Sequence, residues 1–408
     1  MSSATKKPVL ISGAGLASLL FAQGLLRANI PFVIYERDAS LSFRAQGYRL
    51  RLSTEGLDAI ESVLSPEDWQ RFWETTGKTG GGGFEPLNAV TGNEIKPDGS
   101  GPPKPADHLR PGGKMELGSR GGKVVGIARG DMRKLFMRGL EDKVQWSHQI
   151  TGYELTSHGI TALFADGSKS LEGDMLVGGD GIHSKIAKQV SAGKLKTYDT
   201  GARGIHGQAP TTAFKGLGEG VWRMVDETKG DGRKVFVITN VRPDDMNDAS
   251  IHFGWTMGAQ PGVIEAPNND CAIIGKPAAD IAKKLTADWH PRFKPLFEQM
   301  NEDEAAFWKI TCSTPSGVPL WQNAPRVTVI GDAAHSMTPA GGLGANTAVR
   351  DSALLSGLIV EKGGFAYGIT AAYEEQMRVY ASDAVANSYG MATEQFGIII
   401  HEDSSPTV

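Results

Sequence analysis

The stretch KPVLISGAGLASLLFAQGLLRANIPFVIYER, residues 7–37, decides the fold of this chain. It begins with a short apolar run, residues 9–11, which has the length and composition of a buried parallel strand. A glycine turn at 13–15 and an apolar helical run over 16–26 follow directly. A second apolar run ends at Glu36. This order predicts a strand, a glycine turn, a helix and a second strand.

Such a unit is typical of proteins that bind the pyrophosphate of a dinucleotide. Gly13 allows the tight turn, and Gly15 lets backbone N–H groups approach the phosphates. The helix N-terminus directs free N–H groups and the positive end of its dipole toward the anion. Glu36, 23 residues after Gly13, can accept a hydrogen bond from a ribose hydroxyl. Ser18 stands where the motif has a third glycine, which leaves an ordinary glycine turn as the alternative. The flanking strand, the helix and the acid favour dinucleotide binding.

Composition restricts the class of protein. The 408 residues suffice for two domains, and 40% hydrophobic with 22% charged residues is ordinary for a soluble globular protein. A net charge of −4 gives no reason to expect nucleic acid or an acidic membrane as a partner. Cys271 and Cys312 are the two cysteines, so we expect neither a disulfide framework nor a metal site. No run reaches the roughly 18 apolar residues that span a bilayer. We expect a soluble, cytoplasmic monomer or homodimer.

Two further strand–glycine–acid motifs follow the opening unit. Residues 174–181, DMLVGGDG, join a buried strand to glycines and Asp180. Residues 331–346, GDAAHSMTPAGGLGAN, follow a short strand pattern and place Asp332 on a glycine turn. A second acid on a glycine turn suits a long cofactor that is held at both ends. The sequence contains one unit of the GxGxx type, so it predicts no second nucleotide-binding domain.

The chain divides by composition. We expect a dinucleotide-binding domain in three parts, residues 1–76, 124–199 and 313–408, of which the last includes the C-terminal helices. A loop-rich insertion with a hairpin, 77–123, and a substrate domain, 200–312, separate these parts.

Both intervening regions have recognisable patterns. Residues 97–123 are rich in glycine and proline and poor in apolar side chains, which predicts a mobile insertion or a lid. Residues 84–95 resemble a hairpin that turns at 91–93. Strand patterns over 235–240 and 250–257 predict an antiparallel sheet. Aromatic residues of this region belong either to the core or to a substrate pocket: Trp222, Phe236, Phe253 and Trp255.

Together these pieces resemble the single-component FAD-dependent monooxygenases, the family of p-hydroxybenzoate hydroxylase and the tetracycline-inactivating flavin monooxygenases. The resemblance covers most of the chain in matching order: the opening unit with Glu36, Arg44 before Gly47, Arg129 leading a helix, DMLVGGDG, and the motif at 331–346. The last motif is the most specific. The resemblance implies an α/β fold, with a glutathione-reductase-like Rossmann FAD-binding domain and an interleaved α+β substrate domain built on an antiparallel sheet.

The resemblance also implies roles for single residues. Asp332 would bind the ribityl chain of non-covalent FAD, Arg44 and Arg129 the pyrophosphate or ribityl region, and residues 339–346 would line the isoalloxazine ring. Asp180 belongs to a motif associated with FAD and NAD(P)H, although the arginine expected after it is absent. The cofactor-binding residues expected on these grounds are Gly13, Gly15, Leu16, Ala17, Glu36, Arg37, Arg44, Gly47, Arg129, Asp180, Gly181, Asp332, Gly344, Ala345 and Asn346. The catalytic residues expected in the flavin-ring loop, without an acid–base role, are Pro339, Gly341 and Gly342.

The activity implied by the resemblance is oxygen transfer. NAD(P)H reduces FAD transiently, O2 forms a flavin hydroperoxide, and one oxygen atom passes to a small aromatic, polyketide, terpenoid or alkaloid-type molecule of secondary metabolism by hydroxylation or epoxidation. His335 is interpreted as a packed side chain rather than a catalytic base. A flavin halogenase would carry a Trp-x-Trp-x-Ile-Pro stretch, which this sequence lacks. The other alternative is a flavoprotein that uses the fold for non-redox or internal-redox cyclisation, or as a binding scaffold.

Overall fold

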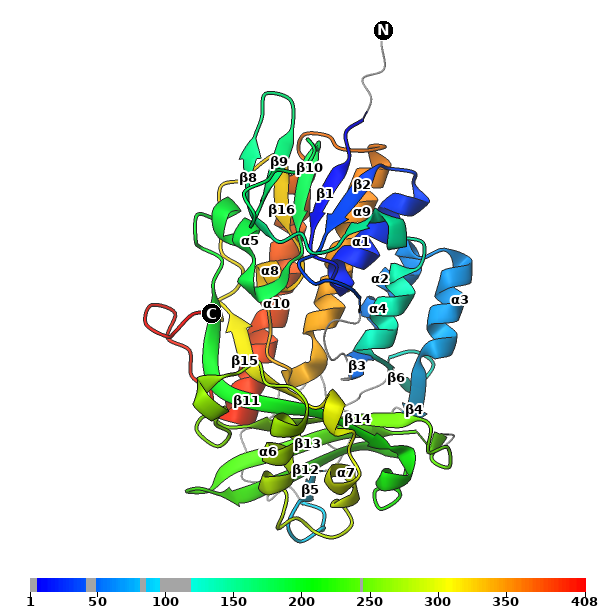
Figure 1. Ribbon diagram of the computed structural model, residues 1–408, viewed down its shortest axis with the longest axis vertical. Coiled ribbons are helices and arrows are strands. Elements are labelled where there is room, and N and C mark those ends of the chain that lie inside the picture. Colours follow the sequence, from blue (N-terminus) through cyan, green and yellow to red (C-terminus); the bar gives the residue numbers. More distant parts are fainter. Residues whose placement is uncertain (1–5, 42–48, 81–85, 96–118, 243–244) are drawn as a thin grey trace.

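A computed structural model describes residues 6–41, 49–80, 86–95, 119–242 and 245–408. Figure 1 shows a parallel sheet with its helices in the upper part of the molecule and a second, larger sheet across the lower part. Within the described ranges, no helix has both the length and the apolar character needed to cross a lipid bilayer.

The opening stretch forms the centre of the five-stranded parallel sheet. The strands in spatial order are β16 (Val327–Val329), β10 (Met175–Gly178), β1 (Val9–Ser12), β2 (Phe32–Tyr35) and β7 (Val144–Gln145). Every residue of β1 and β10 is buried, as expected for parallel strands covered on both faces. The carboxyl ends of these strands meet at one edge of the sheet, so the three glycine–acid motifs lie side by side.

Helices surround this sheet and extend from it. Helix α1 (Leu16–Arg27) packs against α9 (Gly344–Glu361), which also contacts α2 (Thr54–Val63) and α10 (Ile369–Phe396). In Figure 1, α9 and α10 run from the parallel sheet toward the second sheet. The other helices on this side are α3 (Pro66–Thr75), α4 (Arg129–Met137), α5 (Lys185–Val190) and the short α8 (Asp332–His335). The two long helices therefore connect the two sheets.

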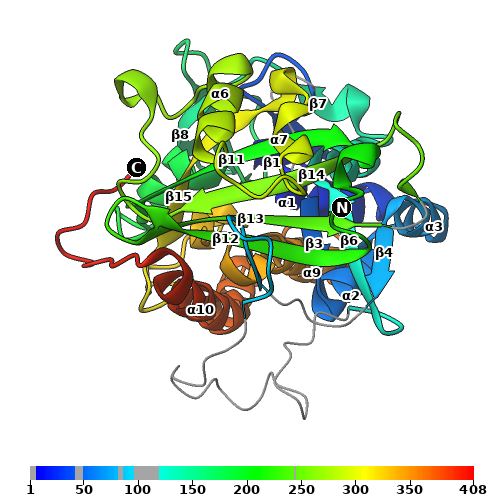
Figure 2. The ribbon, with the colours of Figure 1, turned by 90° about the horizontal axis from the view of Figure 1, so that it is seen from below.

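The second sheet has six strands. Their spatial order is β15 (Ala306–Ser313), β11 (Thr197–Pro210), β14 (His252–Ala259), β13 (Arg233–Val241), β12 (Gly220–Lys229) and β5 (Pro86–Asn88). All neighbours are antiparallel except β5 and β12. Helices α6 (Lys276–Leu285) and α7 (Pro295–Glu298) lie on one side of this sheet and α10 on the other (Figure 2). The predicted antiparallel sheet is present and is larger than the sequence indicated.

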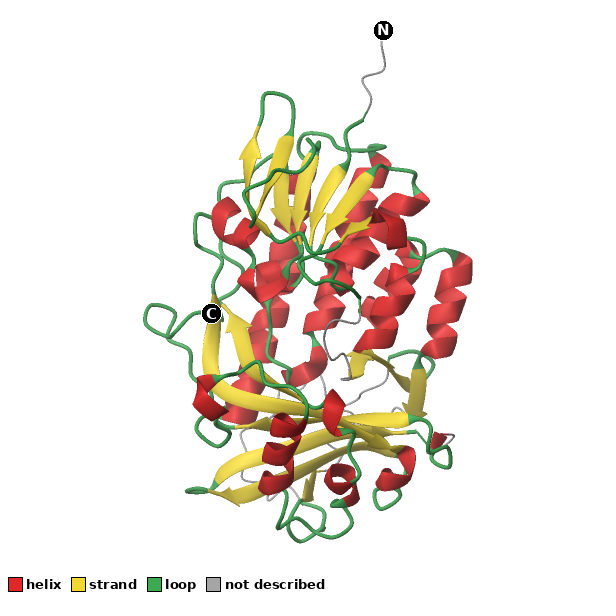
Figure 3. Ribbon diagram, viewed as in Figure 1, coloured by secondary structure: helices red, strands yellow, loops and turns green. Residues whose placement is uncertain are grey.

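Two small sheets complete the fold, and Figure 3 separates their strands from the helices. Strands β3 (Arg49–Leu52), β6 (Lys123–Ala128) and β4 (Gly77–Gly80) form one antiparallel sheet, and β8 (Ile150–Leu155) and β9 (Ile160–Phe164) form the other.

The expected insertion 77–123 is not a single unit. Its first strand, β4, pairs with β6, whereas β5 pairs with β12 of the six-stranded sheet. The turn expected at 91–93 is present, because the Gly92 N–H donates to the Asn88 carbonyl at 2.8 Å and the Asn88 N–H to the Asn93 carbonyl at 2.7 Å. Most of the expected mobile segment 97–123, namely residues 97–118, lies outside the described residues.

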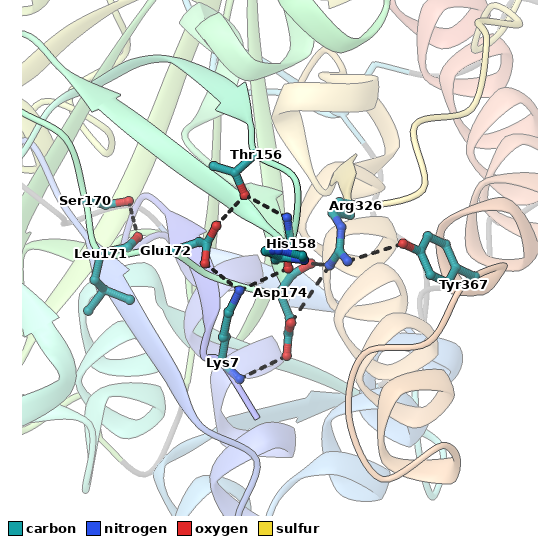
Figure 4. Close-up of polar contacts among 9 residues, drawn as sticks. All are labelled: Lys7, Thr156, His158, Ser170, Leu171, Glu172, Asp174, Arg326 and Tyr367. Carbon is teal, nitrogen blue, oxygen red and sulfur yellow. Dashed lines mark hydrogen bonds and ion pairs between the residues drawn. The ribbon is translucent and has the colours of Figure 1, made fainter. Parts of the chain in front are cut away.

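A network of paired charges lies at the amino-terminal edge of the parallel sheet (Figure 4). Lys7 precedes β1; its ammonium forms an ion pair with Glu172, and its N–H donates to the Asp174 carboxylate at 3.0 Å. Arg326 precedes β16 and donates to the Asp174 carbonyl at 2.6 Å and to the Tyr367 hydroxyl at 3.3 Å. We call these five residues the amino-edge network. It ties the starts of three neighbouring strands together.

Candidate functional site

A cavity of about 2180 Å³ lies at the carboxyl edge of the parallel sheet and extends to one face of the six-stranded sheet. It brings together residues from both ends of the chain. The expected site residues that line it are Gly13, Gly15, Leu16, Ala17, Glu36, Arg37, Arg129, Asp180, Gly181, Phe236, Asp332, Pro339, Gly341, Gly342, Gly344 and Ala345. Arg44 and Gly47 lie outside the described residues.

The first glycine turn leaves room for a ligand at the start of α1. Gly13 has φ +87°, and a Cβ there would lie 2.8 Å from the Gly179 carbonyl oxygen. A side chain at position 13 is therefore excluded both by backbone conformation and by space. Gly15 is the N-cap residue of α1, and no side chain among the described residues caps it. The N–H groups of the first turn consequently face the cavity, an arrangement suited to a phosphate.

Glu36 is held in place at the end of β2. One carboxylate oxygen accepts the Ala14 N–H at 2.6 Å, and the other accepts the Asp38 N–H at 2.9 Å. Arg133 lies 3.9 Å from the same carboxylate and donates to the Ala14 carbonyl at 2.9 Å. Arg133 was not among the predicted site residues, although its position four residues after Arg129 places both arginines on one face of α4. Glu36 and Arg133 together fix the glycine turn.

Two acids at this edge face the cavity without full compensation. The Asp332 side chain is exposed to the cavity, yet the protein around it partly desolvates the carboxyl group and raises its pKa, although His335 and Arg129 oppose the rise. Burial likewise raises the pKa of Asp180. Asp180 Oδ1 is buried and has no hydrogen-bond partner in the described part of the chain. Buried acceptors are normally satisfied, so the unpartnered Asp180 oxygen indicates that a ligand supplies a donor here.

Asp351, on α9, holds the turn that carries Asp332. Its carboxylate accepts the Gly331 N–H at 2.7 Å, His335 Nε2–H at 2.6 Å and the Tyr380 hydroxyl at 2.6 Å. Burial lowers the pKa of His335, but the charges and hydrogen bonds of its surroundings, led by the Asp351 carboxylate and including Asp332, together raise it. His335 is 1% exposed and does not line the cavity. It is therefore a packed side chain, as the sequence analysis interpreted it.

Asn346 lies behind the cavity wall. Its amide donates to the Gly342 carbonyl at 2.8 Å and to the Arg51 carbonyl at 2.9 Å, and its oxygen accepts the Ser53 N–H at 2.8 Å. Gly341 and Gly342 have φ +78° and +65°, which side chains rarely adopt. The Asn346 side chain thus attaches the glycine loop to β3 and does not line the cavity.

Three of the four aromatic residues that the sequence left between core and substrate pocket belong to the core. Phe236 lines the cavity, but Phe253 and Trp255 pack in the core beneath α6 and α7, where Trp255 Nε1–H donates to the Leu296 carbonyl at 3.1 Å. Trp222 packs against the same core. Side chains alternate between the two faces of a strand, so the neighbours of these aromatics face the cavity instead. These neighbours are Val221, Arg223, Gly254 and Thr256.

The sheet face of the cavity also contains residues that the sequence analysis missed. The His206 ring stacks on the Trp308 ring, with centroids 4.8 Å apart and an interplanar angle of 3°. Burial lowers the pKa of His206 to about 3, so the ring is neutral near pH 7. His206 and Trp308 lie on β11 and β15, two strands that the sequence analysis did not locate. The alternation of side chains with a period of two residues along these strands was the signal in the sequence that could have located them.

The parallel sheet, its glycine turns and its acids define a dinucleotide-binding flavoprotein fold. The chain belongs to the FAD binding domain family, whose sequence profile matches residues 6–286 and 311–388. This match confirms the expected family and fold class.

Known proteins are similar over most of this chain. A dual O-methyltransferase/FAD-dependent monooxygenase of Cercospora beticola is 28% identical, over 97% of this chain and 47% of that protein. A second dual O-methyltransferase/FAD-dependent monooxygenase, from Phaeosphaeria nodorum, is 30% identical over 95% of this chain and 42% of that protein. The chain therefore spans less than half the length of these two curated relatives. Klebsiella pneumoniae HpxO, in complex with FAD and uric acid, shares the fold with a TM-score of 0.72 at 20% identity, covering 96% of this chain and 89% of that one.

Proposed function

We propose that this chain is an FAD-dependent monooxygenase that uses NAD(P)H and O2 to hydroxylate or epoxidise a small aromatic or polyketide-type molecule. One observation carries the proposal: a single cavity joins the dinucleotide edge of the parallel sheet to the face of the six-stranded sheet. The loop with Pro339, Gly341 and Gly342 lines this cavity together with Phe236. A cofactor ring and a substrate can therefore meet there.

The residues present fit FAD. Gly13 and the open first turn of α1 suit its pyrophosphate, Glu36 suits a ribose hydroxyl, and Asp332 and Asp180 suit other hydroxyl groups of a long cofactor. Bound FAD supplies electron transfer from NAD(P)H and activation of O2, chemistry that side chains alone do not provide.

The chain's own residues position the reactants and exclude water. Ala340, Phe236 and Phe396 belong to one apolar cluster, which joins the glycine loop, β13 and α10. Apolar walls of this kind keep bulk water from a reactive centre. The Asp351 hydrogen bonds hold the turn that precedes this loop, and Asn346 holds the loop itself. The protein therefore contributes the orientation of the reactants and the exclusion of water.

The test is incorporation of molecular oxygen. The chain, loaded with FAD, is incubated with NADPH or NADH, ¹⁸O2 and a panel of phenolic, indolic and polyketide-like compounds. We expect a substrate that accelerates NAD(P)H oxidation and a product that carries one ¹⁸O atom. Conversion at full rate with oxidised FAD, without NAD(P)H or O2, would instead establish the cyclisation or scaffold alternative.

Non-covalent attachment of FAD is tested separately. Acid precipitation of the yellow protein is expected to release the flavin into the supernatant. Flavin that remains with the pellet would show a covalent bond.

A further inference from the structure

A buried ion pair lies directly behind the turn that carries Asp332. His335 Nε2–H donates to the Asp351 carboxylate at 2.6 Å, and the two side chains are 1% and 0% exposed. Asp332 begins and His335 ends the one-turn helix α8, and residues three positions apart on a helical turn are neighbours. Asp332 faces the cavity, whereas His335 contacts Asp351 on α9. The ion pair therefore adjoins an acid of the cofactor cavity.

Asp351 has the surroundings of an ionised carboxylate. It accepts the Gly331 N–H at 2.7 Å and the Tyr380 hydroxyl at 2.6 Å in addition to His335 Nε2–H. Hydrogen bonds donated to a carboxyl group favour its charged form. A buried carboxylate also requires a cation, and His335 is the one ion-pair partner of Asp351 among the described residues. His335 is therefore the imidazolium partner of this carboxylate.

Titratable and charged groups from the neighbouring elements surround α8. They are Asp351 and Arg350 on α9, Tyr373, Glu374 and Tyr380 on α10, Cys312 on β15, Arg129 on α4, and Asp180 and His183 at the turn Gly181–His183. Burial raises the pKa of both tyrosines and of Cys312, so these groups stay neutral near pH 7. Glu374 is paired with Arg378 at 3.1 Å. Arg129, Asp180 and His183 line the cavity rather than contact the ion pair.

The charge of Asp332 depends on this arrangement. Desolvation by the surrounding protein raises the pKa of Asp332, whereas His335 first and then Arg129 oppose the rise, and Asp351 adds to it. Burial lowers the pKa of His335, but the charges around it, led by Asp351, raise it above the usual value. The imidazolium thus lies between two carboxylates. Without its charge, Asp332 would retain a proton to higher pH.

We propose that His335 is a positioning residue whose positive charge keeps Asp332 ionised, so that Asp332 accepts a hydrogen bond from a hydroxyl group of FAD. This inference rests on the proposed function in taking FAD as the ligand. A hydrogen bond to an ionised carboxylate is stronger than one to a neutral acceptor. His335 does not line the cavity, so it acts on the cofactor through Asp332. A fully packed side chain thereby contributes to cofactor binding.

The first measurement determines the charge of His335 in the apoprotein, the full chain without FAD. The ring signals of ¹³C-labelled histidine are titrated by NMR, and the His335 signal is assigned by its absence from the variant His335→Gln/Asp351→Asn. That double variant leaves neither charge of the pair buried alone, so it remains available if His335→Gln does not fold. We expect an imidazolium at about pH 6. A His335 ring that is neutral at that pH overturns the proposal.

The second measurement is FAD titration of the apoprotein between about pH 6 and pH 9. His335→Gln keeps an N–H donor for Asp351 but loses the charge. It should bind FAD about tenfold less tightly than the wild type at the low end, and this ratio should approach one at the high end, where Asp332 is ionised in both proteins. Tyr380→Phe is the matched control, because it removes a hydrogen bond to the same carboxylate without removing a charge. Its FAD affinity relative to the wild type should be the same at every pH.

The role of Asp332 is tested by combining the variants. Added to Asp332→Asn, the change His335→Gln should no longer have a pH-dependent effect on FAD affinity. A loss in His335→Gln that is equal at every pH, or a pH dependence that survives in the combined variant, overturns the proposal. Absence of FAD binding by the wild type at every pH would instead contradict the proposed function, and the histidine titration would still decide the charge of His335.

Discussion

The charged groups at the two edges of the parallel sheet lie in opposite environments. At the amino edge, Lys7 pairs with Glu172, and Arg326 contacts Asp174 and Tyr367 (Figure 4). At the carboxyl edge, the acids of the strand–glycine motifs face a cavity, and burial raises the pKa of Asp180 and of Asp332. Both edges belong to the same strands. The polar groups of the amino edge have hydrogen-bond and ion-pair partners within the protein, whereas the carboxyl edge leaves carboxylate acceptors for a ligand.

This difference shows where the chain gives up stability for binding. Paired polar groups hold the starts of the strands, while unpaired carboxylates at their ends cost free energy in the absence of a ligand. Ligands of open α/β sheets bind at the carboxyl ends of the strands, where the loops can vary without disturbing the core. This difference predicts that substitutions at the carboxyl edge lower FAD affinity, whereas substitutions at the amino edge lower stability alone.

The largest effect is expected at Gly13. Gly13→Ala adds a Cβ that would meet the Gly179 carbonyl at 2.8 Å and strains a backbone with φ +87°. We expect FAD affinity to fall by about a hundredfold or more and stability by about 1–3 kcal/mol. FAD titration of the apoprotein and thermal unfolding measure the two effects. Gly159→Ala is the control at the amino edge, since its Cβ would lie 2.4 Å from the Gly173 carbonyl; it should lower stability alone. Equal FAD affinity in both variants would contradict the comparison.

A smaller effect is expected at Asp332. Asp332→Asn removes a carboxylate acceptor, so FAD affinity should fall about tenfold to a hundredfold. The same change removes a carboxylate whose pKa is raised in the folded protein, and because this side chain is exposed to the solvent of the cavity, the apoprotein should melt only about 1 °C higher. Asp174→Asn, at the amino edge, should have the reverse pattern, with lower stability and unchanged FAD affinity. An Asp332→Asn protein that binds FAD normally would remove Asp332 from the site.

The pH dependence of the stability of the apoprotein tests the same difference between the two edges. A carboxyl group with a raised pKa in the folded state binds a proton that the unfolded chain has lost, so stability falls as pH rises from the unfolded pKa, about 4, through the folded value. Asp180 and Asp332 both have this sign. Urea unfolding at several pH values should show a decline above about pH 4 that shrinks in Asp332→Asn and again in the double variant with Asp180→Asn. A decline of equal slope in all three proteins would assign it to other groups.

The smallest effect is expected at Arg326. Arg326→Gln loses the hydrogen bond to the Asp174 carbonyl and the stacking on Phe365, whose ring centre lies 4.5 Å from the guanidinium carbon. Because these contacts are partly exposed, we expect a loss of about 1 kcal/mol and no change in FAD affinity. Chemical denaturation and FAD titration provide the measurement. A change in FAD affinity here would mean that the two edges are coupled.

Local sequence patterns predicted the half of the cavity that lies at the edge of the parallel sheet. Its parts are short segments in which the predicted residue comes within three positions of the end of its strand, as Glu36 follows β2 and Asp332 follows β16. Arg133 escaped notice because its contacts, with Glu36 and the Ala14 carbonyl, come from another part of the chain. The half on the six-stranded sheet was harder to predict, since a one-residue error in strand register exchanges the two faces of a strand. Trp222 was selected where Arg223 lines the cavity.

The sequence by itself determined the parallel sheet, its three strand–glycine–acid motifs and the family. The reason is that glycine turns and buried strands are local features, so their residues stand at a recognisable spacing in the sequence. Only the tertiary structure decided which face of the six-stranded sheet meets the cofactor loop. It also separated the insertion into β4 and β5, which join different sheets. The physical reason is that pairing between distant strands sets which side chains are buried together. That pairing places Arg223, Asn240 and Trp308, from three different strands, on one wall of the cavity.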